Sequence, residues 1–389
     1  MGSRTILGAA DVSDDVLVGY ACRVLGLDPA TCTLAGSTAE VVAYDLDAIT
    51  TGGRWWVTAH LDTPDGQRSL RLFVKLVQSW SRSPHFAFVP PELRDLAERS
   101  VPWRTEPLVY QSDLADRLPP GLTMADAVDV RPVDELATAI WLREVEVAEP
   151  VWDAAGLARA AQLLGRVAGS PRVRPLASIG EAEGRRGVRS YAEGRLAIQV
   201  DPMLRADDLW HHPVLAATFD AALRSRLLAH LDRVDEYVDW LEHVPDGTAH
   251  GDACPNNLLV QSGSDDLVLI DFGFWSTQPL GFDLGQLLLG DVQIGRRPAE
   301  HLHRLETVCV AAYVDGLREE GCDTPAAVVQ RAHALQMLIF SGLSAFLLDE
   351  LGRAVGPSPE LLAKAAERAR ISEFVLDLVE QTEGTPLPA

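Results

Sequence analysis

The stretch between His250 and Gly273 constrains the fold of this chain more than any other part of the sequence. It contains two short apolar runs, at residues 258–260 and 267–270, with serine, glycine and aspartate residues between them. Apolar runs separated by turn-forming residues are typical of two strands joined by a tight turn. The sequence therefore predicts a β-hairpin, which is entered by the loop that follows His250.

Oxygen-bearing side chains lie at the open end of this predicted hairpin. If the turn is centred on Ser264, antiparallel pairing places the amide of Asn257 opposite the carboxylate of Asp271. Asp252 lies on the loop that enters the hairpin. Mg²⁺ prefers hard oxygen ligands and keeps water and phosphate oxygens in its remaining positions. The spacing therefore predicts a magnesium site at this end of the hairpin.

These residues resemble the catalytic loop and the metal loop of the aminoglycoside phosphotransferase family. His-Gly-Asp at 250–252 is followed by Asn257, and Ile-Asp-Phe-Gly stands at 270–273. Protein kinases have His-Arg-Asp and a later asparagine in the first of these loops. The resemblance implies a small-molecule kinase of the α+β class with a bilobal, protein-kinase-like fold. Its N-terminal lobe is expected to hold an antiparallel sheet and a helix, and its C-terminal lobe mainly helices.

The same resemblance implies roles for individual residues. Asp252 is the expected catalytic base, and Asn257 and Asp271 are the expected catalytic ligands of Mg²⁺, with ATP or GTP as the nucleotide. Asp283 is expected to hydrogen-bond the catalytic loop; the alternative is that it caps a helix. His250 is expected to pack and hydrogen-bond beneath this loop rather than to transfer a proton.

The N-terminal part of the chain has the pattern of a helix followed by a sheet. Residues 11–27 have apolar side chains at helical spacing, and Ser13 is a suitable N-cap. Strands are predicted at Ala39–Leu46, Arg54–Leu61 and Leu70–Val77, with a strong turn sequence between the last two.

The link between the first two of these strands contains Thr51, Gly52 and Gly53. Kinase-like folds place a phosphate-covering loop here, although this sequence lacks the Gly-x-Gly-x-x-Gly pattern of protein kinases. Backbone N–H groups in such a link can bind phosphate. The alternative is a plain hairpin turn, and the sequence leaves both hypotheses open.

Lys75 is a single charge in a strand that is otherwise apolar. A buried charge must be paired or must reach a cleft; the alternative is a lysine on the wet face of the strand. By resemblance, Lys75 holds the α- and β-phosphates of the nucleotide. Its expected ion-pair partner is Glu106, near the start of a helix predicted over 102–118, and Glu92 and Glu98 are the other candidates.

Two further strands lead to the expected junction between the lobes. They are predicted at Ala127–Pro132 and Thr138–Val145. By resemblance, main-chain groups of Glu144, Val145 and Glu146 contact the edge of the nucleotide base.

The predicted domains are a nucleotide-binding lobe at 1–147 and a catalytic and substrate lobe at 148–389. Asp153 is a suitable cap for the first helix of the second lobe. An apolar stripe over 223–241 predicts a core helix. Residues 169–215 have no clear assignment, and an insertion that shapes the substrate side is the hypothesis for them.

Composition limits the partners of the chain. The 389 residues carry a net charge of −22, which argues against nucleic acid as a partner because phosphate binding needs a basic surface. The acidity suits a cationic substrate, but it also suits solubility alone. Five cysteines without a Cys-x-x-Cys pair are typical of reduced thiols, and no stretch is long and apolar enough for a membrane span. We therefore expect a cytoplasmic protein.

The expected acceptor is a hydroxyl group of a small molecule. Three hypotheses remain for the function: phosphorylation of an aminoglycoside-type antibiotic, phosphorylation of another metabolite or of Ser/Thr in a peptide, and nucleotide binding without catalysis. The presence of Lys75, Asp252, Asn257 and Asp271 disfavours the third. The phosphate machinery is shared across the family, so the sequence identifies neither the acceptor nor the oligomeric state.

Overall fold

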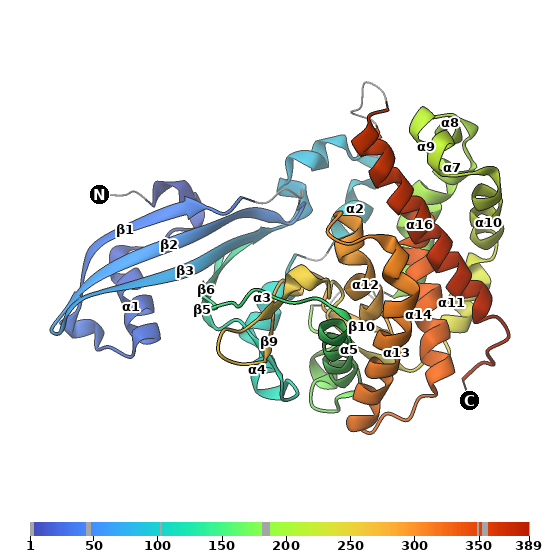
Figure 1. The fold of residues 1–389 in the computed structure, drawn as a ribbon. Helices are drawn as coiled ribbons and strands as arrows, with labels where there is room; N and C mark the ends of the chain where they lie inside the picture. The colour runs from blue at the N-terminus through green and yellow to red at the C-terminus, as the bar shows by residue number, and fades with distance from the viewer. Residues whose placement is uncertain are drawn as a thin grey trace. The chain divides into compact units, whose positions relative to one another are not determined.

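The computed structural model describes residues 4–43, 48–101, 103–180, 187–347, 350–351 and 357–388 (Figure 1). Its contacts divide the chain into two units. The first unit comprises Met1–Asp116, Thr123–Ala148 and Val260–Phe274, and the second comprises Arg117–Leu122, Glu149–Leu259 and Trp275–Ala389. The two units therefore interleave along the sequence, and the predicted domain division between 147 and 148 stays a prediction.

A five-stranded antiparallel sheet is the centre of the first unit. Its strand order is β1-β2-β3-β6-β5, and the first three strands are the long arrows in Figure 1. The strands are β1 (Thr33–Val41), β2 (Thr51–Thr63), β3 (Gly66–Gln78), β5 (Ala127–Asp134) and β6 (Ala137–Arg143).

One face of this sheet packs against helix α1 (Asp14–Leu25). Ser13 caps the helix as predicted, because its side chain accepts a hydrogen bond from the Val16 N–H. The apolar side chains that the sheet contributes to this core alternate along the strands: Trp55, Val57 and Ala59 from β2, and Leu72 and Val74 from β3. Because successive side chains in a strand point to opposite faces, the residues between them, Lys75 included, lie on the other face.

The strands predicted at 54–61 and 70–77 are confirmed and are longer at both ends. The prediction at 39–46 is wrong in its bounds, because β1 begins at Thr33 and ends at Val41; residues 44–46 of that prediction lie outside the described residues.

Thr51–Gly53 were expected in a link between strands, but they begin β2 and pair with β3 across a bulge. Packing explains the glycines. A Cβ at Gly52 would lie 2.7 Å from Oε1 of Gln78, and one at Gly53 would overlap the buried ring of Trp55. The backbone of this segment therefore belongs to the strand ladder, and its contact with phosphate stays a prediction.

Short helices connect β3 to the later strands. They are η3 (Trp80–Arg82), η4 (Pro84–Phe88), η5 (Pro91–Leu93), α2 (Arg94–Ser100), α3 (Thr105–Gln111) and α4 (Leu114–Arg117). The single helix predicted over 102–118 is wrong, and its first residue lies outside the described residues. Ser112 interrupts it, because its hydroxyl donates to the carbonyl of Val109 and accepts from the N–H of Leu114.

The second unit is mainly helical. The hypothesis of a core helix over 223–241 becomes two helices, α10 and α11, and much of 169–215 forms short helices with a π-helix among them. The elements are α5 (Ala154–Gly169), η6 (Arg174–Leu176), α6 (Val188–Tyr191), the π-helix η7 (Ala192–Val200), α7 (Asp201–Arg205), α8 (Asp207–Trp210), α9 (Pro213–Thr218), α10 (Ala221–Leu231), α11 (Val234–Leu241), α12 (Asp283–Gln293), η10 (Ala299–His301), α13 (Leu302–Glu319), α14 (Ala326–Phe340), η11 (Gly342–Ser344) and α16 (Pro359–Gln381). Asp153 caps α5 as predicted, through its carboxylate and the N–H groups of Ala155 and Gly156.

The remaining strands are short. β7 (Asp246–Ala249) and β10 (Ser276–Pro279) form an antiparallel pair. β8 (Leu258–Val260) and β9 (Leu267–Leu269) are neighbours in a three-stranded sheet with β4 (Leu122–Met124), of order β4-β9-β8. The predicted hairpin is therefore confirmed, while the pairing of Asn257 with Asp271 stays a prediction.

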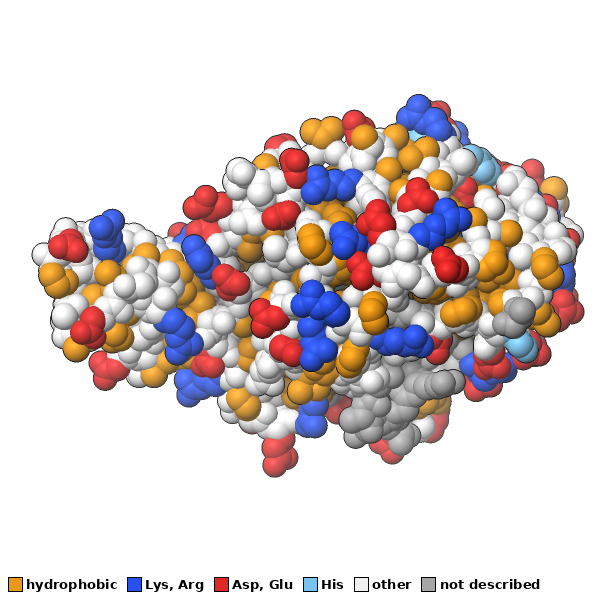
Figure 2. Space-filling view, turned by 90° about the horizontal axis from the view of Figure 1, so that it is seen from below, with side chains coloured by type: hydrophobic (Ala, Val, Ile, Leu, Met, Phe, Trp, Pro, Cys, Tyr) orange, Lys and Arg blue, Asp and Glu red, His pale blue; other side chains and the backbone are white. Residues whose placement is uncertain are grey.

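The expected α+β class is confirmed, with an antiparallel sheet in the N-terminal part and helices in the C-terminal part. On the face seen in Figure 2, acidic and basic side chains are interspersed. Among the described residues, none of the helices is long and apolar enough to cross a membrane.

Helices α5 and α13 approach each other closely through glycine. A Cβ at Gly165 would overlap the carbonyl oxygen of Tyr313, and one at Gly316 would overlap the carbonyl oxygen of Gln162. Two backbones that meet at this distance leave no room for a methyl group on either side.

Gly316→Ala is therefore expected to destabilise the protein by about 1–3 kcal/mol, because α13 must move away from α5. Gly19→Ala in α1 is the control, since a Cβ there has open space around it and the helix gains from alanine. Thermal unfolding checks the prediction. A melting temperature of Gly316→Ala equal to that of the unaltered protein would contradict it.

Candidate active site

Lys75 forms a buried charge cluster within the first unit. Its Nζ lies 2.7 Å from Oε2 of Glu106, and both side chains are almost fully buried. The ion pair predicted between Lys75 and Glu106 is therefore present. The same Nζ lies 2.9 Å from Oδ1 of Asp271, a contact that the sequence did not predict. One ammonium group thus joins β3, the first turn of α3 and the residue that follows the hairpin.

The charges in this cluster influence one another. Burial alone lowers the pKa of Lys75, but the carboxylates of Glu106 and Asp271 outweigh it and the net direction is upward, so the ammonium stays charged. Burial raises the pKa of Glu106 to about 7, against the opposing charge of Lys75. The cluster therefore depends on the contact between the lysine and its two carboxylates.

Asp271 has an unusual backbone conformation. Its φ is 63°. In the described part of the chain, Asp271 is the one non-glycine residue with a positive φ. This left-handed conformation costs about 1–2 kcal/mol for an ordinary residue, although aspartate tolerates it better than most. The next residue, Phe272, is buried and packs edge to face against Tyr110, with 5.4 Å between the ring centroids. Tyr110 lies one helical turn after Glu106. Helix α3 therefore contacts Phe272 through Tyr110, and it is linked to Asp271 through the contact of Glu106 with Lys75.

The segment after β6 contains the residues expected to contact the nucleotide base. Glu144, Val145 and Glu146 have no regular secondary structure. The carboxylate of Glu144 pairs with Arg71 at 3.0 Å, and the carbonyl of Glu146 accepts a hydrogen bond of 2.8 Å from the N–H of Ser262. The segment is thus tied to the same hairpin that leads to Asp271.

The predicted catalytic loop lies in the second unit and is internally hydrogen-bonded. Asn257 is buried, and its Nδ2 donates to the carbonyl oxygen of Asp252 at 2.8 Å and to Oδ2 of Asp252 at 3.0 Å. The N–H of Asp252 donates to Nδ1 of the fully buried His250 at 3.3 Å. The carboxylate of Asp252 therefore has an orientation fixed by Asn257, and His250 packs beneath the loop as expected.

The carboxylate of Asp283 accepts hydrogen bonds from the backbone of this loop. Its Oδ2 accepts from the N–H of His250, and its Oδ1 accepts from the N–H of Gly251, both at 2.9 Å. Burial raises the pKa of Asp283, and these two N–H donors oppose the rise. Phe282, not Asp283, is the N-cap of α12, so the contact is the one that the resemblance implied.

Each unit contains an oxygen donor of the kind that Mg²⁺ prefers. In the second unit, the nitrogen of the Asn257 amide is committed to Asp252, and its oxygen is the remaining acceptor. In the first unit, Asp271 supplies a carboxylate. Mg²⁺ is commonly bound through one or two protein oxygens, with phosphate and water completing the shell. The described residues contain no group of three or more His, Cys, Asp or Glu side chains that could hold a metal, so a cage built wholly from such residues is not what they offer.

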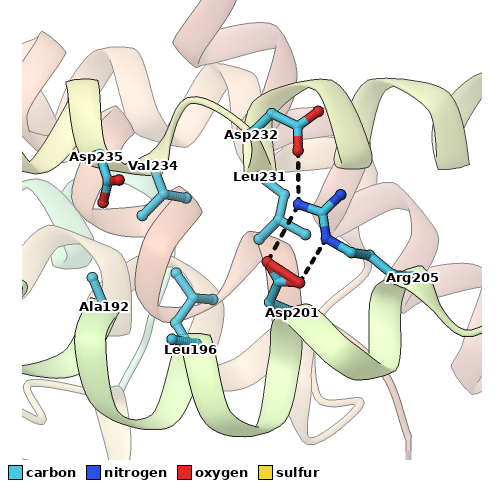
Figure 3. A pocket seen from close by; sticks show the side chains of 9 residues that line it. Ala192, Leu196, Asp201, Arg205, Leu231, Asp232, Val234 and Asp235 are labelled. Atoms are coloured by element: carbon cyan, nitrogen blue, oxygen red, sulfur yellow. Dashed lines mark hydrogen bonds and ion pairs between the residues drawn. The ribbon is translucent and has the colours of Figure 1, made fainter.

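A separate pocket of about 300 Å³ lies in the second unit, between the π-helix and the ends of α10 and α11 (Figure 3). Arg205 spans one side of it and contacts Asp201 at 2.6 Å and Asp232 at 2.7 Å. Its lining contains none of the predicted site residues. The pocket is therefore distinct from the candidate active site.

Sequence reasoning missed several residues on the sheet face of Lys75. Trp56 and Phe73 pack edge to face with 5.2 Å between ring centroids, and the guanidinium of Arg71 lies 4.2 Å from the centre of the Trp56 ring. Residues 71, 73 and 75 alternate along β3, so this period-2 pattern around Lys75 is the signal that could have found them.

Asp283→Asn is expected to loosen the catalytic loop. Two N–H groups now donate to the two carboxylate oxygens of Asp283, and an amide has only one acceptor oxygen. We expect a loss of about 1–3 kcal/mol in stability and faster amide hydrogen exchange at 250–252. Exchange followed by mass spectrometry measures this, with the exposed Asp246→Asn as control. Unchanged protection of the loop would show that the contact is dispensable.

The turn before Asp283 packs closely against the buried residue His333. A Cβ at Gly281 would be 3.2 Å from that of His333, and burial lowers the pKa of the imidazole to about 4. A pKa below the unfolded value of about 6.5 stabilises the fold above pH 6.5, and this stability is lost as pH falls towards 4. We expect His333→Leu to show a shallower fall in melting temperature between pH 6.5 and 4. A slope equal to that of the unaltered protein would contradict this.

Comparisons with known proteins place the chain in a family. Residues 92–319 match the sequence model of the phosphotransferase enzyme family (APH). No curated protein sequence matches the chain.

The comparison with solved structures found three enzymes among its matches. The amicoumacin kinase hAmiN, in complex with AMP-PNP, Ca²⁺ and Ami, is 12% identical with a TM-score of 0.46, and 96% of each chain is covered. The choline kinase of Cryptosporidium parvum Iowa II is 11% identical with a TM-score of 0.44, again over 96% of each chain. The type I macrolide 2′-phosphotransferase is 17% identical with a TM-score of 0.44, over 92% of this chain and 98% of that chain.

The family model spans more than half of the 389 residues and includes both predicted loops. The resemblance drawn from the two loops is therefore confirmed. The chain belongs to the phosphotransferase enzyme family, whose members are nucleotide-dependent kinases that act on hydroxyl groups of small molecules.

Proposed function

We propose that this protein transfers the γ-phosphoryl group of ATP, or of GTP, to a hydroxyl group of a small molecule in the presence of Mg²⁺. The observation that carries the proposal is the contact of Lys75 with both Glu106 and Asp271 in the first unit. In protein kinases, phosphoryl transfer needs a lysine paired with a glutamate and a nearby aspartate that binds the metal, and the contacts of Lys75 support the same roles here.

In this proposal, each charged residue of the first unit has one task. Lys75 binds oxygens of the α- and β-phosphates, and Glu106 fixes the direction of the lysine side chain. Main-chain groups of residues 144–146 bind the base. Asp271, together with Asn257, is a ligand of Mg²⁺, which when bound neutralises the charge that develops on the phosphate oxygens.

The second unit supplies the base for the acceptor. The carboxylate of Asp252 takes the proton of the acceptor hydroxyl while its oxygen forms a bond to the γ-phosphorus and the bond to the β-phosphate oxygen breaks. Asn257 and His250 orient Asp252 through the contacts of its side chain and its N–H. Asp283 acts as a positioning residue, because it holds the loop through the backbone.

The acceptor is a small molecule, and the antibiotic and metabolite hypotheses differ only in its identity. A peptide acceptor and a binding protein without catalysis are the alternatives. The complete set of Lys75, Asp252, Asn257 and Asp271 disfavours the second alternative, because loss of one of them is the usual sign of a kinase-like protein that no longer transfers phosphate.

Asp252→Asn is expected to lower phosphoryl transfer about 10²- to 10⁴-fold, because an amide cannot accept the hydroxyl proton. ATP labelled at the γ-phosphate, Mg²⁺ and a library of hydroxylated small molecules measure transfer, and a separate peptide pool tests the peptide alternative. Calorimetry should find nucleotide affinity retained, and Asp265→Asn in the exposed hairpin turn is the matched control.

Label in a small molecule with the unaltered protein and the control, but not with Asp252→Asn, is the predicted result. Label in peptides alone would move the function to peptide modification. Equal labelling by Asp252→Asn would contradict the role of Asp252, and nucleotide binding without transfer to any acceptor would favour the binding protein.

A further inference from the structure

Arg54 lies beside Lys75 on the sheet. The two residues are direct partners in the antiparallel pairing of β2 with β3, so their side chains stand on the same face. This is the face opposite the α1 core, since the neighbours Trp55 and Val74 belong to that core. Arg54 is half-buried.

The position of Arg54 is fixed by the residues on either side of it. The ring of Trp55 is buried on the core face and fills the space that a side chain at Gly53 would need. The strand pairing of Thr51 and Gly53 with β3 continues β2 on the N-terminal side of Arg54, where a link between strands was expected. The backbone of Arg54 is thus held in a strand and loses little conformational freedom when a ligand binds.

The charges around Lys75 leave room for a second cation. One ammonium faces the carboxylates of Glu106 and Asp271, which gives the group a net charge of −1 when both acids are ionised. A nucleoside triphosphate carries several negative charges, so its approach to this group is opposed unless further positive charge is present. The charge of Arg54 reaches the cluster, because it lowers the pKa of Glu106.

Arg71 is the second arginine on this part of the face. Arg71 contacts Glu144 at 3.0 Å and covers the ring of Trp56. It lies four residues from Lys75 along β3, beyond Phe73. Among these two guanidinium groups, the one that stands next to Lys75 is therefore Arg54.

We propose that Arg54 binds the polyphosphate of the nucleotide together with Lys75, as a second cation supplied by β2. The proposal rests on the proposed function, since it takes the ligand to be a nucleoside triphosphate. A guanidinium group is suited to this task because its planar donors bind two phosphate oxygens at once.

Calorimetric titration with ATP, ADP and adenosine tests this proposal. We expect Arg54→Gln to weaken ATP binding about ten- to a hundredfold, the value of a charge-assisted hydrogen bond, and to leave adenosine binding unchanged. Arg54→Lys is expected to lie between the two, because it keeps the charge but loses the bidentate geometry. Arg68→Gln is the matched control, because Arg68 lies on the same hairpin but pairs with the core residue Leu61.

The outcomes separate the two proposals. Equal ATP affinity of Arg54→Gln and the unaltered protein would overturn the role of Arg54 and leave the proposed function standing. An equal loss for ATP and adenosine would overturn it as well, since it would mark a structural role. Absence of nucleotide binding by the unaltered protein would overturn the proposed function itself. If Arg54→Gln does not fold, the ATP affinity of Arg54→Lys decides, and a value equal to that of the unaltered protein would overturn the proposal.

Discussion

The buried ammonium group of Lys75 is the interaction on which the first unit depends. Burying a charge costs several kcal/mol, and only close carboxylates offset this cost. Glu106 and Asp271 provide them, at 2.7 and 2.9 Å. Removal of one partner of such a pair leaves an uncompensated buried charge and costs about 3–5 kcal/mol. The sheet, the start of α3 and the exit of the hairpin are therefore tied together by electrostatics as well as by apolar packing.

The catalytic loop of the second unit is held in a different way. Backbone N–H groups, rather than an ion pair, meet the carboxylate of Asp283, and the loop is closed by the hydrogen bonds of Asn257 and His250. Behind Asp283, the hydroxyl of Tyr313 accepts the N–H of Gly281 at 3.0 Å. The loop is hydrogen-bonded to the first residue of α12, and the turn before α12 is hydrogen-bonded to α13. The helical core therefore determines the conformation of the loop. The backbone of this loop is therefore preorganised.

Short stretches of sequence predicted the strands and the helix caps. The strands of the hairpin and of the sheet follow from apolar runs bounded by turn-forming residues, and Ser13 and Asp153 cap the helices that they were expected to cap. The break at Ser112 and the strand at residues 51–53 were missed because side-chain contacts decide them. The contact of Lys75 with Asp271 joins residues far apart in sequence, so spacing could not predict it. Glu106 was found by resemblance alone.

The central claim is that Lys75 and Asp271 act on one nucleotide. A double-mutant cycle on the affinity for Mg²⁺–ADP, with Lys75→Met, Asp271→Asn and the double variant, tests this most directly. We expect strong non-additivity, with a coupling free energy of about 1–3 kcal/mol, because each residue loses its partner when the other is removed. Additive effects in variants that remain folded would contradict it.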